Sequence, residues 1–209
     1  MNGGIAYPVG VRGSIGVNAS YGESRYPNQE IAEGVEVTSE FVSVGGNASV
    51  RVSPFLTLSG SLGWSEATSN TPLQPGFDGV TWNILAAYSG PRLGARLSGG
   101  RSVSGGDGSF ANFAIVNEYL AVVTYRSSPR LGFSAGYGRT ERDNRANPLV
   151  PPEFLGVDTS VDRLFAGANL SFARNFRASL DLNYQDRSSN RPEFDFDSFS
   201  VVFALGARF

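Results

Sequence analysis

The chain has 209 residues and a formal net charge of −2, and it contains no Cys, no His and no Lys, since all 17 basic residues are Arg. These absences exclude disulfides and thiolate metal sites, Ser-His and Cys-His nucleophile pairs, and Schiff-base lysines. Without a basic excess, the composition is not typical of nucleic-acid binding. We therefore expect no enzyme activity, no metal, no cofactor and no nucleic-acid partner.

The first elements expected along the chain are a short lead and a strand. Residues 1–9 lack the basic start and apolar stretch of a signal peptide, and no apolar run of about 18 residues suggests a membrane-spanning helix. From Val11 to Tyr21, apolar residues alternate with small or polar ones, which is the period of a half-buried strand. We expect residues 1–209 to form one domain in which 1–9 precedes the first strand.

The same alternation recurs along the whole chain. Pro8, Pro54, Pro91 and Pro129 stand at intervals of 46, 37 and 38 residues, and an alternating run follows each of them. Return strands with the same period complete the hairpins. The pattern predicts ten strands, near 11–21, 42–52, 56–64, 79–89, 93–100, 113–126, 131–138, 160–173, 176–184 and 196–209.

The connections between these strands alternate in length. The turns at 53–55, 90–92, 127–130 and 173–175 are short, whereas long loops are expected at 23–41, 65–78, 104–112, 140–158 and 186–195. Alternating strands in even number, with short and long connections at opposite ends, are typical of a transmembrane β-barrel. We predict an all-β fold, a closed antiparallel transmembrane barrel of about ten strands with short periplasmic turns, long extracellular loops and both chain ends periplasmic. A soluble β-sandwich or a secreted repeat solenoid is the alternative.

Aromatic residues lie near both ends of the expected strands, as in the aromatic girdles of membrane barrels. Tyr21, Trp64, Tyr137 and Tyr184 end strands on the loop side. Tyr88 and other rings lie on the turn side. This distribution predicts where the two lipid–water interfaces cross the sheet.

The C-terminal segment carries a family resemblance. Phe199, Val201, Phe203, Leu205 and Phe209 alternate and end on an aromatic residue. This run resembles the C-terminal assembly signal of Gram-negative outer-membrane proteins, although that pattern often has Gly where this chain has Ala204 and a larger residue where it has Ala207. The hairpins are also similar in texture to the putative β-barrel porins of proteobacteria. The resemblance implies an integral outer-membrane protein whose partners are the lipid bilayer, lipopolysaccharide and the barrel-assembly machinery.

Charge is sorted between the two ends of the expected strands. Nine Arg and no acid belong to the turn side, whereas 17 of the 19 acids belong to the loop side. Strand parity predicts that Arg12, Arg51, Arg96, Arg126, Arg177 and Arg208 face the lumen, together with Glu118 and Asp181. These Arg either form an anion-attracting constriction or extend to water and pair with the C-terminal carboxylate and turn carbonyls. Apolar residues share the lumen face, namely Leu85, Leu120, Val122, Phe165 and Val202, so the interior is either mostly filled or a narrow path with an apolar stretch.

The remaining candidates lie near the loops. Arg101 and Arg139 have the outward parity and are predicted to contact lipopolysaccharide phosphates, a charged rim being the alternative. Glu193, Asp195 and Asp197 are a weaker candidate for a divalent cation, so we expect no metal site. We predict a porin-like barrel for passive passage of small solutes that prefers anions. The alternatives are a plugged barrel that binds polysaccharide or lipopolysaccharide, and a fragment or engineered pore derived from a larger export barrel. Neither the solute nor the oligomeric state follows from these patterns.

Overall fold

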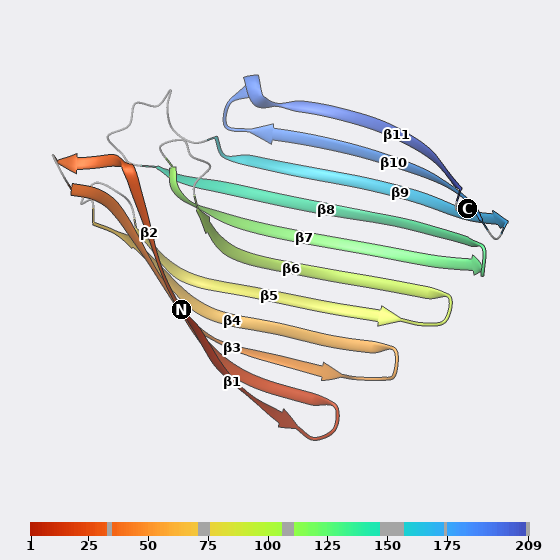
Figure 1. Ribbon diagram of the computed structural model, residues 1–209, viewed down its shortest axis with the longest axis horizontal. Coiled ribbons are helices and arrows are strands. Elements are labelled where there is room, and N and C mark those ends of the chain that lie inside the picture. The colour runs from red at the N-terminus through yellow and green to blue at the C-terminus, as the bar shows by residue number, and fades with distance from the viewer. Residues whose placement is uncertain (33–34, 71–75, 106–110, 147–156, 174, 208–209) are drawn as a thin grey trace.

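The computed structural model describes residues 1–32, 35–70, 76–105, 111–146, 157–173 and 175–207, and it is built almost entirely of strands (Figure 1). No helix in these ranges is long and apolar enough to cross a membrane. Eleven strands form one antiparallel sheet in chain order: β1 (Asn2–Val9), β2 (Gly13–Ala32), β3 (Val35–Arg51), β4 (Leu56–Ser69), β5 (Phe77–Ser89), β6 (Leu93–Gly105), β7 (Ala111–Ser128), β8 (Leu131–Ala146), β9 (Thr159–Ala173), β10 (Phe176–Ser189) and β11 (Phe196–Ala207). A short 3₁₀ helix, Pro192–Phe194, precedes β11.

The short turns lie together at one end of the sheet, here called the turn end; the opposite end is the loop end (Figure 1). The predicted turns are confirmed, because β3–β4, β5–β6, β7–β8 and β9–β10 are joined at those positions. The predicted strand lengths are wrong at the loop end, where β2 extends to 20 residues and β7 to 18. Cross-strand pairing continues well into segments that alternation alone had assigned to loops.

An eleventh strand, β1, replaces the lead expected at 1–9. It pairs with β2 from Asn2↔Ser20 to Val9↔Gly13, and Gly10 makes the tight turn with a φ of 61°, a conformation that favours glycine. Pro8 fits in β1 because the strand is at the sheet edge, where a missing N–H leaves no neighbour unpaired. The amino group of Met1 donates to the carbonyl oxygen of Tyr21, so the first residue lies away from the turn end. The prediction that the N-terminus lies on the side of the short turns is therefore wrong.

The sheet is open, which corrects the prediction of a closed barrel. Each strand pairs with its chain neighbours, and β1 and β11 are the two edges (Figure 1). Because the strand number is odd, β1 and β11 run in the same direction, and they cannot pair with each other in the antiparallel manner of the remaining sheet. Alternation assigns residues to faces, but it carries no information on whether the two edges meet.

The two faces of the sheet differ in chemistry throughout. The apolar face carries the large side chains of the alternating runs, such as Val17, Leu62 and Phe203, which are 64%, 63% and 63% exposed. The polar face carries mainly Ser, Asn, Gly and Arg from the intervening positions. Only seven described residues are buried: Ser65, Phe77, Gly99, Phe113, Ala114, Ile115 and Val116. The sheet therefore has almost no internal core, and its apolar side chains face outward.

The small apolar cluster at the loop end joins the β4–β5 pair of strands to the β6–β7 pair, where β5 and β6 are no longer paired with each other. Phe77 packs against Phe113 with ring centroids 6.0 Å apart, and Ile115 and Val103 complete the contact with Ala67. Ala67 and Phe77 have the parity of the polar face, whereas Val103, Phe113 and Ile115 have that of the apolar face. Pairing of β5 with β6 stops at Trp82↔Arg101. The outer ends of β6 and β7 therefore lie over the polar side of β4 and β5.

Candidate functional site: the polar face

A hollow of about 550 Å³ lies over the polar face of β2 to β7. Its lining is dominated by small polar groups, including Asn18, Ser43, Ser61, Asn83 and Ser98. Arg96 and Glu118 also line it, as do Leu85 and Leu120, so two of the predicted apolar lumen residues reach the same space. Because the hollow combines donors, acceptors and apolar carbon, it suits a small hydrated solute better than a metal ion. Among the described residues, no group of acids could hold a metal.

A second hollow, of about 610 Å³, lies at the turn end over β7 to β11, and we call it the turn-end hollow. Arg126 and Arg177 both line it, together with Asn169, Ser171 and Ser179. Strand pairing explains the arrangement, since Arg126 faces Gly132, Gly132 faces Asn169, and Arg177 faces Ser171. Gly132 has no side chain, and the Asn169 amide extends across it. The hollow therefore gathers two cations and several neutral hydrogen-bonding groups.

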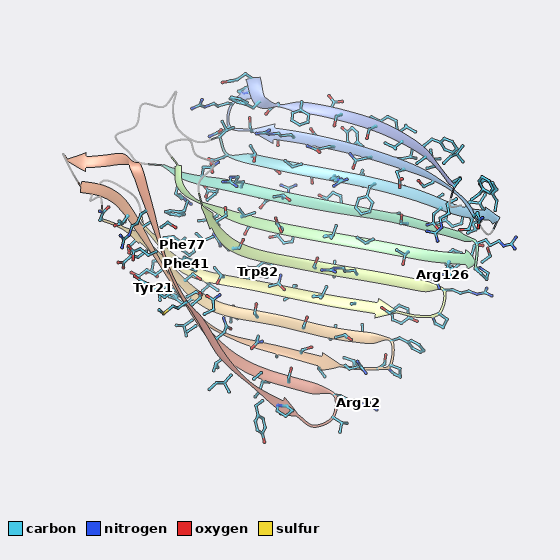
Figure 2. The ribbon with its side chains drawn as sticks, viewed as in Figure 1. Arg12, Tyr21, Phe41, Phe77, Trp82 and Arg126 are labelled. Carbon is cyan, nitrogen blue, oxygen red and sulfur yellow. The ribbon has the colours of Figure 1, made fainter. Side chains whose placement is uncertain are left out.

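The six predicted lumen Arg do not form one ring. Arg12 lies in the β1–β2 turn, where its carbonyl accepts from the Arg51 N–H at 2.7 Å, and Arg51 ends β3. Figure 2 shows Arg12 and Arg126 far apart along the same end of the sheet. Arg96 lines the first hollow, whereas Arg126 and Arg177 line the turn-end hollow. Arg208 lies outside the described residues.

The Asp181 carboxylate lies beside a neutral hydroxyl group and not beside a cation. Its carboxylate and the Ser134 hydroxyl both lie over Gly167, where a Cβ atom would meet them at 2.8 and 3.0 Å. Glu118 faces Gly100 on β6 and Thr140 on β8. In the described part of the chain, neither acid forms an ion pair. The two predicted lumen acids thus form no ion pair with the described Arg of the polar face.

Three further Arg of the polar face were not predicted from the sequence: Arg142, Arg163 and Arg187. Arg163 donates to the Asn183 side chain and lies 5.7 Å from the centre of the Phe165 ring. Arg187 lies 5.8 Å from the Phe196 ring centre. Arg142 and Arg187 were counted with the loop charges because β8 and β10 were expected to end earlier, and Arg163 was counted with them although it lies within the strand expected at 160–173. Continuing the alternation past Tyr137 and Tyr184 would have placed Arg142 and Arg187 on the polar face, and the parity of Leu164 would have done the same for Arg163.

The apolar face has a sharp limit at the loop end. On nine strands, the apolar run ends at a charged residue of the same face, and these residues form what we call the charged border: Glu23, Glu40, Glu66, Asp78, Arg101, Arg139, Asp162, Asp186 and Asp197. Many are direct cross-strand neighbours, as in Glu66↔Asp78 and Asp162↔Asp186↔Asp197. The border thus follows strand pairing from β2 to β11, with β7 as the exception.

The two predicted lipopolysaccharide contacts belong to this charged border but differ in environment. Arg139 is paired with Glu141 at 2.8 Å and with Asp162 at 3.5 Å, and Tyr137 donates to Asp162. The Nε of Arg101 is buried and makes no hydrogen bond within the described chain. Unlike Arg139, Arg101 forms no ion pair with a described carboxylate.

The residues of the predicted assembly signal lie on β11. Phe199, Val201, Phe203 and Leu205 face the apolar side, opposite Tyr184, Leu182, Leu180 and Ala178 of β10. Phe209 lies outside the described residues. Because β11 is an edge strand, these side chains are open on one flank, and each is more than half exposed.

Comparison with protein-family models and with curated proteins finds no match. Three solved structures resemble the chain at 12% identity: a Pseudomonas aeruginosa FadL homologue (TM-score 0.47, all of this chain, 66% of that one), the CymD monoaromatic hydrocarbon channel (0.42, 98% and 72%) and LpxR from Salmonella typhimurium (0.36, 99% and 87%). All three are outer-membrane β-barrels. The chain spans 66% of the length of the FadL homologue. Likeness of this degree assigns no activity to the chain.

Proposed function

We propose that the chain forms the wall of an outer-membrane barrel through which small solutes pass along the polar face. The observation that carries the proposal is the exposed apolar face, which spans all eleven strands and ends at the charged border. An uncovered apolar surface of this extent is unfavourable in water and favourable against lipid. The turns would face the periplasm and the loop end the exterior.

The height of the apolar face fits a bilayer. The run from Leu56 to Trp64 on β4, before Glu66, has nine residues, so at about 3.4 Å per residue it is about 27 Å long. At a tilt of about 40°, such a strand crosses roughly 20 Å of hydrocarbon, near the band height of outer-membrane barrels. Trp64 beside Glu66 and Tyr184 beside Asp186 are placed as interfacial rings, which supports an aromatic girdle.

The membrane also requires that the two sheet edges be paired, because unpaired backbone groups are costly in hydrocarbon. Since β1 and β11 run in the same direction, an odd number of additional strands between them would pair antiparallel with both edges. A larger barrel that contains this sheet therefore stands as the alternative to a barrel closed by this chain alone. Because the chain has no Cys, a disulfide engineered between β1 and β11 would report directly whether these edges meet.

The solute preference we propose is for anions. The strands carry seven Arg on the polar face, Arg51, Arg96, Arg126, Arg142, Arg163, Arg177 and Arg187, against Glu118 and Asp181. A low-dielectric wall focuses the field of such charges into the path. In planar bilayers with a salt gradient, we expect a reversal potential on the anion side, and replacing Arg51, Arg126 and Arg177 with Ser should reduce it. A cation-selective wild type would contradict the proposal.

A plugged barrel with a surface role is the second candidate. It is favoured by the Phe77–Phe113 contact, which brings the outer ends of β6 and β7 over the polar side of β4 and β5. That contact narrows the loop end of the path. Absence of any current from correctly folded protein would favour this reading over transport.

A further inference from the structure

We propose that the turn-end hollow is a binding site for a small soluble oxyanion, such as phosphate, held by the guanidinium groups of Arg126 and Arg177. The inference rests on the proposed function in one respect, which is that the polar face of the sheet is in contact with water. It goes further by assigning a discrete site and a class of ligand.

The first argument is uncompensated charge. Arg126 and Arg177 line the same hollow, and neither forms an ion pair with a described carboxylate. No acid is among the residues that line the hollow. The nearest acid on the same face of β10 is Asp181, four residues from Arg177 and hence roughly 13 Å away along the strand. An anion that enters the hollow is attracted by both guanidinium groups.

The second argument is the set of neutral groups around the two cations. The Asn169 amide can donate, and so can the hydroxyls of Ser171 and Ser179. The Asn169 side chain lies over Gly132, toward the strand that carries Arg126. An oxyanion offers several acceptor oxygens, and guanidinium binds such oxygens in a bidentate manner.

The location selects the source of the oxyanion. Asn169 and Arg177 have polar-face parity, whereas Phe176 and Leu180 on β10 have the parity of the opposite, lipid-facing side. A lipid headgroup would have to enter from the apolar side. The ligand is therefore a soluble oxyanion that reaches the hollow through water.

The test is a phosphate titration of the full chain, ¹⁵N-labelled and folded in detergent micelles, followed through the Arg Nε–H resonances. We expect two of these resonances to shift saturably with phosphate, and each to be missing from the spectrum of Arg126→Gln or Arg177→Gln. Each substitution should weaken phosphate binding by about tenfold, because a charged hydrogen-bonding partner is lost. Ser179→Asp, which keeps both Arg, should also weaken it because its carboxylate competes for them.

Arg92→Gln is the matched control, since Arg92 lies in a turn at the same end of the sheet, loses the same charge and does not line the hollow. It should leave phosphate affinity unchanged. The site is refuted if no resonance shifts saturably, or if Arg126→Gln and Arg177→Gln bind phosphate as well as Arg92→Gln does. Because binding in micelles needs no current, failure of the site and failure of transport are separate results.

Discussion

Replacing Leu62 with Arg tests whether the apolar face of the sheet is in contact with lipid. Leu62 lies on β4 between Leu58 and Trp64, four residues from the charged border at Glu66, and it is 63% exposed. In water, substitution of so exposed a residue typically changes stability by about 0.5 kcal/mol or less. Near the middle of a bilayer, Arg on the outer face of a barrel costs about 2–4 kcal/mol. Folding into vesicles should then be weakened about 30-fold to 700-fold.

The assay is reversible urea unfolding in phosphatidylcholine vesicles, followed by Trp fluorescence, with two controls on the same strand. Ser61→Arg adds the same side chain to the polar face and should have little effect. Leu56→Arg lies at the turn end of the apolar run, where the cost falls to about 0–1 kcal/mol. Equal stabilities for Leu62→Arg and Ser61→Arg, or folding of the wild type without lipid or detergent, would refute the membrane assignment.

Three further outcomes are expected. Protease added to intact cells should cleave within 141–157 and spare the turn at Pro129, because the loop end is proposed to be extracellular; cleavage at Pro129 instead would invert the topology. Deletion of Phe209 should lower insertion in cells, measured by heat-modifiable mobility, and normal insertion would remove its role as an assembly signal. Arg101→Ser should reduce lipopolysaccharide retained on purification more than Arg139→Ser does, since Arg139 is already paired with two carboxylates; the reverse order would count against this contact.

The predicted alternation and the short turns survive in the structure because both are local properties. A residue's face is set by its parity along one strand, so Val17, Leu62 and Phe203 were assigned to the apolar face correctly. Turn positions follow from Pro and Gly, whose backbone preferences act within a few residues. Nothing from elsewhere in the chain is needed for either conclusion.

Strand ends were predicted poorly because cross-strand pairing decides them. The alternation of apolar with polar residues ends at the charged border, but the backbone hydrogen bonds between strands continue beyond it. β8, for example, extends to Ala146. As a result, Arg142 and Arg187 were assigned to loops although they lie on strands. β1 was missed because Pro8 and two Gly weaken its strand signal, and pairing with β2 overrides that weakness.

The sequence alone determined the all-β fold class, the two faces of the sheet and the sorting of charge between the two ends of the sheet. Each of these follows from the order of residues along single strands. The tertiary structure decided what depends on strands meeting: eleven strands in place of ten, edges that run in the same direction, and the charged border formed across nine strands. It also divided the predicted Arg cluster, placing Arg96 in one hollow and Arg126 with Arg177 in another. Parity assigns a side chain to a face, but only the pairing of neighbouring strands determines which side chains share a space.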